Sequence, residues 1–163
     1  MMTSAPVSPA QRGSAREPAL GFVLVEAARL YRARIDRAFE QAGLGLTAGE
    51  ARTLAYVNAH PGLRQGALAE KMNVEPMTLV GFLDRLEAAG VVAREADPTD
   101  RRAKIVALTP ASAPYLEGIA DTAAATRREA TCGLSADEQE ILRGLLLRLR
   151  DNLAREHRAR DEK

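Results

Sequence analysis

A charged turn between two short apolar segments constrains the fold of this chain more than any other feature. The turn spans residues 97–102 and reads Asp-Pro-Thr-Asp-Arg-Arg, with Val91-Val92 before it and Ile105-Val106 after it. Proline and aspartate favour tight turns, because proline fixes φ and an aspartate side chain accepts hydrogen bonds from the following backbone. The pattern predicts a β-hairpin over residues 91–95 and 104–108, with two arginines at its tip.

Two short helices are predicted directly before this hairpin. Residues 65–72 repeat apolar residues at helical spacing, and Asn73 is a natural residue for the end of that helix. Pro76, at a first helical position, opens a second helix over about 76–89. Two helices followed by a hairpin with a basic tip describe a winged helix-turn-helix. In that arrangement one helix enters the major groove of DNA and the hairpin arginines reach the neighbouring minor groove.

Helical spacing gives the second helix an apolar inner face, with leucines at 79, 83 and 86 and Val80, and an opposite face of small residues with one arginine. Small side chains suit close approach to base edges. Gly81 weakens the helix by about 1 kcal/mol relative to alanine, which close approach to DNA would explain and drift would explain equally. The candidate DNA-contacting residues are Gln65, Met77, Thr78, Gly81, Arg85, Asp100, Arg101, Arg102 and Lys104.

Long helices are predicted on both sides of this segment. Residues 19–42 carry apolar residues every three or four positions, and an alanine-rich helix then begins near Pro110 or Pro114. The leucines of a last helix, over about 136–158, span an arc of about 140°. That arc is wide for a helix that packs on one neighbour, so the first and last helices are predicted to form a dimer interface. Its candidate residues are Leu24, Ile141, Leu142, Leu145, Leu149 and Leu153.

Two segments have the pattern of a capping box, in which a Ser or Thr side chain and a Glu side chain cap a helix start reciprocally. They are Thr47-Ala48-Gly49-Glu50, which opens a helix over about 48–59, and Ser135-Ala136-Asp137-Glu138. His60 follows the first of these helices, and we expect it to cap the helix end rather than to bind a ligand.

The composition sets limits on the class of protein. A chain of 163 residues that is 46% hydrophobic is long enough for one globular domain with a real core. The single cysteine, Cys132, excludes an intrachain disulfide framework and fits a reducing compartment. No apolar run approaches the roughly 20 residues of a membrane span, and the N-terminus lacks the apolar stretch of a signal peptide. We therefore expect a cytoplasmic protein, without a membrane partner, whose residues 1–18 form a flexible tail.

Charge does not by itself predict a nucleic-acid binder. The formal net charge is +1, and residues 60–104 contain seven Lys or Arg and seven Asp or Glu. General nucleic-acid binders usually have a basic excess. If this chain binds DNA, it does so through individually placed arginines and helix N-termini, and its non-specific binding is expected to be weak.

The stretch from Leu46 to Thr109 resembles the MarR family of bacterial transcription regulators, and its SlyA-like branch in particular. Three segments carry the resemblance: Leu46-Thr47, the run from Asp84 to Arg94, and Asp100 to Lys104 followed by Leu108-Thr109. The resemblance implies a mainly α fold with a small β-hairpin, in which a winged helix-turn-helix is flanked by N- and C-terminal dimerisation helices. Residues 19–163 would form one such domain, with the winged lobe at about 46–109 and the dimerisation helices at about 19–42 and 110–158.

The resemblance also implies a function. A homodimer would bind a pseudo-palindromic operator in double-stranded DNA, as a repressor that a small aromatic or phenolic effector relieves. By position, Arg102 would be the minor-groove arginine, Asp100 would hold it by an ion pair, and Thr78 would be a small hydroxyl residue of the recognition helix. Gly81 departs from the family, because many relatives have arginine there. Oxidant-sensing relatives use a cysteine in the first helix, so a thiol switch of that kind is not expected here.

The sequence leaves two other classes of function to compare with this one. A winged-helix protein-interaction module without DNA binding would fit the neutral charge of residues 60–104, although such a module has no use for a wing arginine. An enzyme is not expected, because the two histidines, His60 and His157, lie far apart in the sequence and no metal-ligand spacing, nucleophile motif or phosphate loop occurs. We expect no cofactor and no metal, and no effector-binding residues are assigned.

Overall fold

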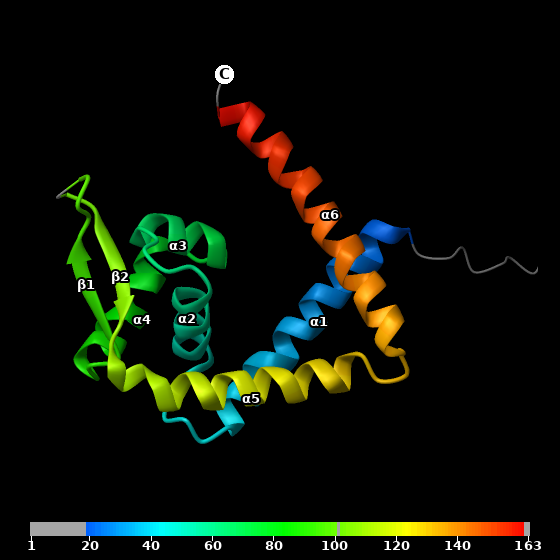
Figure 1. Ribbon diagram of the computed structural model, residues 1–163, viewed down its shortest axis with the longest axis horizontal. Helices are drawn as coiled ribbons and strands as arrows, with labels where there is room; N and C mark the ends of the chain where they lie inside the picture. The colour runs from blue at the N-terminus through cyan, green and yellow to red at the C-terminus, as the bar shows by residue number, and fades with distance from the viewer. Residues whose placement is uncertain (1–18, 101, 162–163) are drawn as a thin grey trace, which may run out of the picture.

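The computed structural model of the protein describes residues 19–100 and 102–161, with side chains through Arg155. The expected tail of residues 1–18 and the candidate Arg101 lie outside the described residues, as does the side chain of His157. Within the described ranges the chain is mostly helical and has one antiparallel hairpin, as predicted from the sequence (Figure 1).

The predicted helices and strands are confirmed to within a few residues. Pro114 lies in the first turn of the alanine-rich helix, whereas Pro110 opens a short 3₁₀ turn before it, which decides the start that the spacing left open. The described elements are, in order, α1 (Leu20–Gln41), α2 (Ala48–Ala59), α3 (Gln65–Met72), α4 (Pro76–Ala88), β1 (Val92–Ala96), β2 (Lys104–Leu108), η1 (Pro110–Ser112), α5 (Ala113–Ala130) and α6 (Ala136–Asp161).

Both predicted capping boxes are present. At the start of α2 the Glu50 backbone N–H donates to Thr47 Oγ1 at 3.3 Å, and the Thr47 N–H donates to the Glu50 carboxylate at 2.8 Å. At the start of α6 the corresponding distances between Ser135 and Glu138 are 3.2 and 2.7 Å. His60 occupies the C-cap position of α2, as expected. These local interactions fix where the two helices begin.

Helices α2, α3 and α4 and the hairpin enclose one apolar core, and together they form the winged lobe. The predicted inner face of α4 is confirmed for Leu79, Leu83 and Leu86, which are buried in this core, whereas Val80 is only half-buried. Strands β1 and β2 pair with Val92 opposite Leu108 at the lobe end and Ala96 opposite Lys104 toward the tip. Burial of each large apolar side chain contributes about 1.5–3 kcal/mol, so this core is the main source of stability for the lobe.

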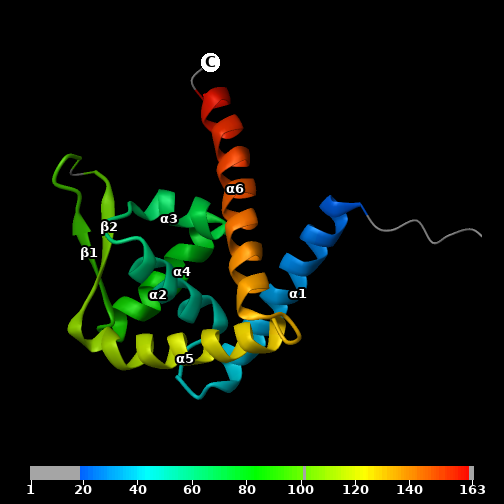
Figure 2. The same ribbon diagram turned by 45° about the vertical axis from the view of Figure 1, so that its right-hand side comes forward.

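Helix α5 connects the hairpin to the helices at the other end of the molecule. Figures 1 and 2 show it running along one side of the winged lobe and continuing past α1. Ile119 of α5 and Ile35 and Phe39 of α1 belong to the core, whereas the part of α1 before Ile35 has no buried residue. Within a single chain, therefore, only the C-terminal third of α1 contributes buried residues to the core.

Helix α6 rises from the far end of α5 and stands apart from the winged lobe (Figure 1). None of its side chains through Arg155 is buried, although many of them are leucines. We call the exposed large apolar residues of the two terminal helices the α1–α6 surface. Its members are Leu20, Phe22, Val23, Val25, Leu30, Tyr31, Ile141, Leu142, Leu145, Leu146 and Leu153. No helix in the described part of the chain is both long and apolar enough to span a membrane.

Candidate nucleic-acid interface

The start of α4 presents its side chains outward. Pro76 is at the first helical position, and the side chain of Met77 is exposed to 77% although methionine is apolar. Thr78, the next residue, is exposed as well. Because the leucines of the inner face hold α4 in the lobe, the first turn of α4 is fixed in position while its outer side chains remain free to contact another molecule.

Gly81 lies one turn further along the same outer face. A Cβ added there would have only the Nη1 atom of Arg85 nearby, at 3.8 Å, among the atoms of the described residues. Packing within the chain therefore does not require glycine at this position. The outer surface of α4 has room for a longer side chain, such as the arginine that the resemblance leads one to expect.

Arg85, predicted to contact DNA, also has partners within its own chain, and its contact with DNA stays a prediction. Its Nε donates a hydrogen bond to Glu50 Oε1, and its guanidinium lies 5.6 Å from the centroid of the Phe82 ring. Glu50 is buried, and its other carboxylate oxygen accepts the Thr47 N–H of the capping box. Burial disfavours the charged carboxylate, but the hydrogen bonds from Arg85 and Thr47 prevail and lower the pKa of Glu50. From the sequence, only the capping role of Glu50 was predicted, because Arg85 lies 35 residues away.

The same region contains a close approach between α2 and α4. A Cβ added at Gly49 would lie 2.3–2.8 Å from three carbon atoms of the Phe82 ring. Glycine at this position lets the aromatic ring of α4 rest directly on the backbone of α2. The contact sets the separation of the two helices beside the Glu50–Arg85 pair.

The wing tip differs in one respect from what the resemblance implies. Asp100 Oδ1 accepts a hydrogen bond from the backbone N–H of Arg102, at 3.1 Å. Among the described residues, the guanidinium within ion-pair distance of Asp100 belongs to Arg64, with Nη1 at 4.0 Å from Asp100 Oδ2. The expected Asp100–Arg102 ion pair is therefore replaced by a backbone contact, and the side chain of Arg102 is exposed.

Arg64 makes further contacts with the wing that sequence reasoning missed. Its Nε donates to Asp97 Oδ2 at 2.7 Å, and its Nη2 donates to Thr99 Oγ1 at 3.2 Å. Asp97 is buried, and its Oδ1 accepts from both the backbone N–H and the hydroxyl of Thr99. Hydrogen bonds from Thr99 and then from Arg64 hold the pKa of Asp97 far below its usual value. We call Arg64, Asp97, Thr99 and Asp100 the wing clasp.

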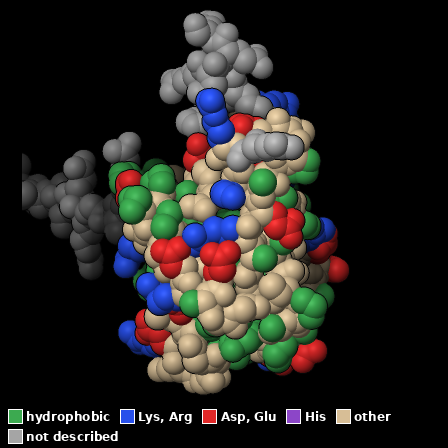
Figure 3. Space-filling view, turned by 90° about the vertical axis from the view of Figure 1, so that its left-hand side faces the viewer, with side chains coloured by type: hydrophobic (Ala, Val, Ile, Leu, Met, Phe, Trp, Pro, Cys, Tyr) green, Lys and Arg blue, Asp and Glu red, His purple; other side chains and the backbone are tan. Residues whose placement is uncertain are grey.

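The remaining candidates on this side of the lobe are Gln65, which is half-buried in the first turn of α3, and Lys104, which is exposed at the start of β2. On the face that carries the hairpin, Lys and Arg side chains lie beside Asp and Glu side chains (Figure 3). Arg94, for example, pairs with Asp84 and with Glu87. The even charge balance of the sequence is thus organised into local ion pairs rather than into a broad basic surface.

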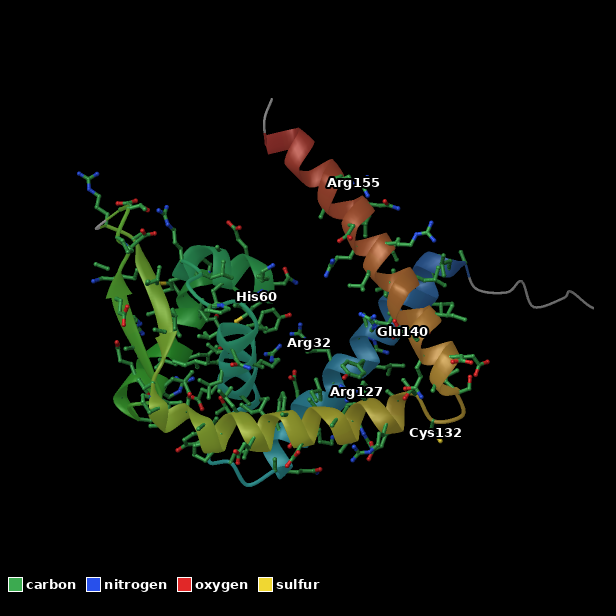
Figure 4. The ribbon with its side chains drawn as sticks, viewed as in Figure 1. Arg32, His60, Arg127, Cys132, Glu140 and Arg155 are labelled. Atoms are coloured by element: carbon green, nitrogen blue, oxygen red, sulfur yellow. The ribbon has the colours of Figure 1, made fainter. Side chains whose placement is uncertain are left out.

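Other polar features are spread over the lobe and the helices outside it. Cys132 is exposed in the turn between α5 and α6, and His60 is at the end of α2, in a different part of the molecule (Figure 4). A cavity of about 300 Å³ lies between α1 and α5, with Arg34, Arg37 and Thr126 in its wall. Within the described ranges, no cluster of three or more His, Cys, Asp or Glu could hold a metal ion.

Candidate dimer residues are exposed or half-buried in the single chain. Ile141, Leu142, Leu145 and Leu153 belong to the α1–α6 surface, and Leu24 and Leu149 are half-buried beside it. The structure therefore leaves these side chains without a fully apolar environment within one chain.

Comparison with known proteins identifies the family. The MarR family model matches residues 46–104. A probable transcriptional regulator from Pseudomonas aeruginosa is 36% identical, with 80% of this chain and 96% of that chain covered and a TM-score of 0.61. A crystal structure of MarR is 26% identical, with 89% and 97% covered and a TM-score of 0.72. A MarR-family transcriptional regulator from Silicibacter pomeroyi is 28% identical, with 82% and 89% covered and a TM-score of 0.70.

The SlyA-like branch stays a prediction, since these relatives do not distinguish branches. The matched stretch contains α2, α3, α4, β1 and the wing turn and ends at the first residue of β2, so it includes the outward face of α4 and the wing clasp. The structural likeness extends well beyond it, over most of the described helices. This chain belongs to the MarR family and has the winged-helix fold of its transcription regulators.

Proposed function

We propose that this protein is a dimeric, sequence-specific DNA-binding transcription regulator that acts as a repressor. The observation that carries the proposal is the outward first turn of α4, with Met77 and Thr78 exposed, on a helix whose inner leucines are fully packed. A rigid helix with free outer side chains is what reading base edges in a major groove requires. Met77, Thr78 and Gly81 would face the bases.

The helix start also supports phosphate binding. Glu75 is the N-cap residue of α4, and its side chain makes no capping hydrogen bond. Pro76 has no N–H, and the Thr78 N–H donates to the Glu75 carbonyl at 3.0 Å. In the first turn of α4 it would therefore be the Met77 N–H that donates to a phosphate oxygen, with the helix dipole favouring the negative charge. Arg102, exposed at the wing tip, would reach the adjacent minor groove, and Lys104 would contact the phosphate backbone.

A second copy of the chain is the partner that we propose for the α1–α6 surface. Large exposed apolar side chains on two helices favour association, and an obligate interface buries about 2,000 Å² or more. A two-fold interface would place two α4 helices about 34 Å apart, one turn of DNA, and would demand a pseudo-palindromic operator. In this division, residues 46–109 bind DNA and the flanking helices hold the dimer together.

The neutral charge of the lobe predicts how binding is distributed between specific and non-specific DNA. Non-specific affinity comes almost entirely from phosphate neutralisation. Since ion pairs within the lobe already engage Arg64, Arg85 and Arg94, few cations remain for that purpose. Binding should therefore depend on a correct operator more strongly than it does for a basic winged helix. A DNA-binding role also places the protein with the chromosome, in the cytoplasm.

Relief of repression by a small aromatic or phenolic effector is part of the same proposal, and its support is family membership. The cavity between α1 and α5 reaches the lower end of the size range for small-ligand sites. The cavity lies between α1, a proposed dimerisation helix, and α5, the helix that follows the wing. A bound molecule would therefore contact both helices and could change their relative position. Equilibrium dialysis with benzoate- and phenol-type compounds, with and without DNA, would test the idea.

Selection from a random DNA pool tests the main proposal. The purified protein should enrich one pseudo-palindromic motif, and fluorescence anisotropy should show binding that weakens as salt rises. Arg102→Ala should lose about 1–3 kcal/mol of binding free energy on that motif, with the fold intact by circular dichroism. A pool that remains unenriched would instead favour the alternative, a winged-helix protein-interaction module without DNA binding.

A further inference from the structure

We propose that Arg64 is a positioning residue for the wing: it ties the wing tip to the start of α3 and so holds Arg102 at the angle needed for the minor groove. This inference rests on the proposed DNA-binding function. Arg64 precedes both helices of the helix-turn-helix in the sequence, 33 positions before Asp97, whereas the wing follows them. The role is distinct from direct contact with DNA, and the two can be separated by experiment.

Arg64 joins three wing residues through one guanidinium group. Nε binds Asp97 at 2.7 Å, Nη2 binds Thr99 at 3.2 Å, and Nη1 lies 4.0 Å from Asp100. A planar guanidinium with donors in fixed directions restrains the orientation of such a set far better than the point charge of a lysine. The side chain thus holds the turn at several points along its length.

The anchor on the wing is itself held firmly. Asp97 is buried, with 7% of its surface exposed. Its Oδ1 accepts hydrogen bonds from the Thr99 backbone N–H at 2.7 Å and from the Thr99 hydroxyl at 2.6 Å. Arg64 takes the remaining oxygen, Oδ2. Since both oxygens of this carboxylate are engaged, removal of Arg64 leaves a partly unsatisfied acceptor rather than a free one that can rotate to a new partner.

Arg64 is equally well fixed at its other end. It is the N-cap residue of α3, and its carbonyl oxygen accepts the Leu68 N–H at 2.9 Å. Its backbone also forms an isolated antiparallel bridge with Ile105 of β2. The Arg64 backbone therefore lies where α3 contacts β2, and its side chain reaches from there to the wing tip.

Asp100 transmits this restraint to the minor-groove arginine. Its Oδ2 faces Arg64 Nη1, and its Oδ1 accepts the backbone N–H of Arg102. The turn also has backbone hydrogen bonds of its own, from Asp97 N–H to the Ala103 carbonyl and from Ala103 N–H to the Asp100 carbonyl. Loss of Arg64 should consequently leave the hairpin formed but allow its tip to move relative to α3.

Without Arg64, the mobile wing tip would have to become ordered when the protein binds DNA, and this ordering would reduce the binding free energy. Fixing a mobile side chain on association costs about 0.5–1.5 kcal/mol, so Arg64→Ala should weaken operator binding about two- to tenfold. If Arg64 acts through Arg102, the same substitution made in an Arg102→Ala protein should have little further effect. If Arg64 touches a phosphate itself, the two losses should add, and the salt dependence should fall by about one ion. Additive losses would overturn the positioning role.

Asp97→Asn separates the proposal from simple electrostatics. The substitution removes a negative charge near the DNA, so general charge repulsion predicts tighter binding. The clasp predicts weaker binding, because an amide is a poorer acceptor for Arg64 than a carboxylate. Lys71→Ala is the matched control, since Lys71 is an exposed cation on α3 outside the clasp. Any loss of DNA affinity in Lys71→Ala should add to the loss of affinity in Arg102→Ala.

A measurement without DNA distinguishes failure of the clasp from failure of the proposed function. Trypsin cleaves after arginine, and a mobile wing tip is a better substrate than a restrained one. Arg64→Ala should be cut after Arg102 faster than wild type under native conditions, whereas Lys71→Ala should be cut at the wild-type rate. Equal rates for wild type and Arg64→Ala would overturn the clasp even if DNA binding is confirmed. A wild-type protein that binds no DNA would overturn the proposed function and, with it, the role assigned to Arg64.

Discussion

Glu50 and Arg85 form an ion pair that joins the start of α2 to the last turn of the proposed recognition helix α4. Glu50 is 5% exposed and also caps α2 through Thr47, so a single carboxylate serves the local start of one helix and the tertiary position of another. This arrangement makes Arg85 a structural residue in the free protein. The exposed part of the Arg85 side chain can still face DNA, so substitution of Arg85 can be used to compare its structural role with a role in base reading.

Arg85→Ala should destabilise the protein more than it alters sequence preference. The substitution leaves the buried Glu50 carboxylate without its cation, which costs about 1–3 kcal/mol in unfolding free energy. Urea denaturation followed by circular dichroism measures this loss. A variant as stable as wild type that selects a different DNA motif would instead identify Arg85 as a base-reading residue. Glu50→Gln, in which the capping box can survive, shows how much of the loss belongs to the ion pair.

Stability should fall on acidification, and part of that loss should disappear in Glu50→Gln. The pKa of Glu50 is lowered from an ordinary value of 4.5, so its contribution is complete above that value and is lost as pH falls through the lower folded pKa. Asp97, whose pKa is also lowered, acts in the same direction. Thermal denaturation between pH 7 and about pH 3 tests the sign. Equal pH dependence in wild type and Glu50→Gln would contradict the assignment.

Gly49→Ala should destabilise the lobe, because the added methyl group would collide with the Phe82 ring at 2.3 Å. Overpacking of this kind costs about 1–3 kcal/mol. Gly66→Ala is the matched control: it is also a helical glycine, and an added Cβ there meets no described atom within 4 Å. The control should be neutral or stabilising by up to about 1 kcal/mol. Equal effects of the two substitutions on chemical denaturation would show that α2 and α4 do not approach as closely as described.

Gly81→Arg should change which DNA sequences are bound without harming the fold. The position has open space on the outer face of α4, so the longer side chain can be accommodated and can reach a base or phosphate. Parallel selections from one random pool, with Gly81→Ala as the control for helix propensity, compare the two motifs. If all three proteins enrich the same motif with the same affinity, position 81 does not face the groove.

Leu145→Asp should convert the proposed dimer to a monomer and abolish specific binding. Leu145 is 54% exposed in the single chain, so the substitution adds little strain within one chain but buries a charge in the proposed interface. Sedimentation of wild type should give about twice the 17.6 kDa mass of the chain, and that of the variant the chain mass itself. Arg150→Ala, about 140° around α6 from Leu145, should remain dimeric. A monomeric variant that still binds its operator tightly would refute the link between the dimer and the palindrome.

The helices and the hairpin could be predicted from the sequence because their boundaries are decided by neighbouring residues. Pro76 starts α4, the Thr47 and Ser135 capping boxes start α2 and α6, and Asn73 ends α3 with the positive φ of 51° that asparagine tolerates. Apolar spacing then identified the inner face of α4, which the leucines confirm. Each of these signals acts within a few residues of the chain.

Which charged side chains meet was decided only by the tertiary structure. Arg64 and Asp97 are 33 residues apart, and Glu50 and Arg85 are 35 apart, so no local pattern distinguishes these partners from the neighbouring charges. Asp100 was expected to hold the Arg102 guanidinium and instead binds its backbone N–H, because the packing of α3 against the hairpin brings Arg64 within reach. Periodicity and caps determine where an element begins and which face it buries. Side-chain pairing depends on the distances between elements, and those exist only once the core has formed.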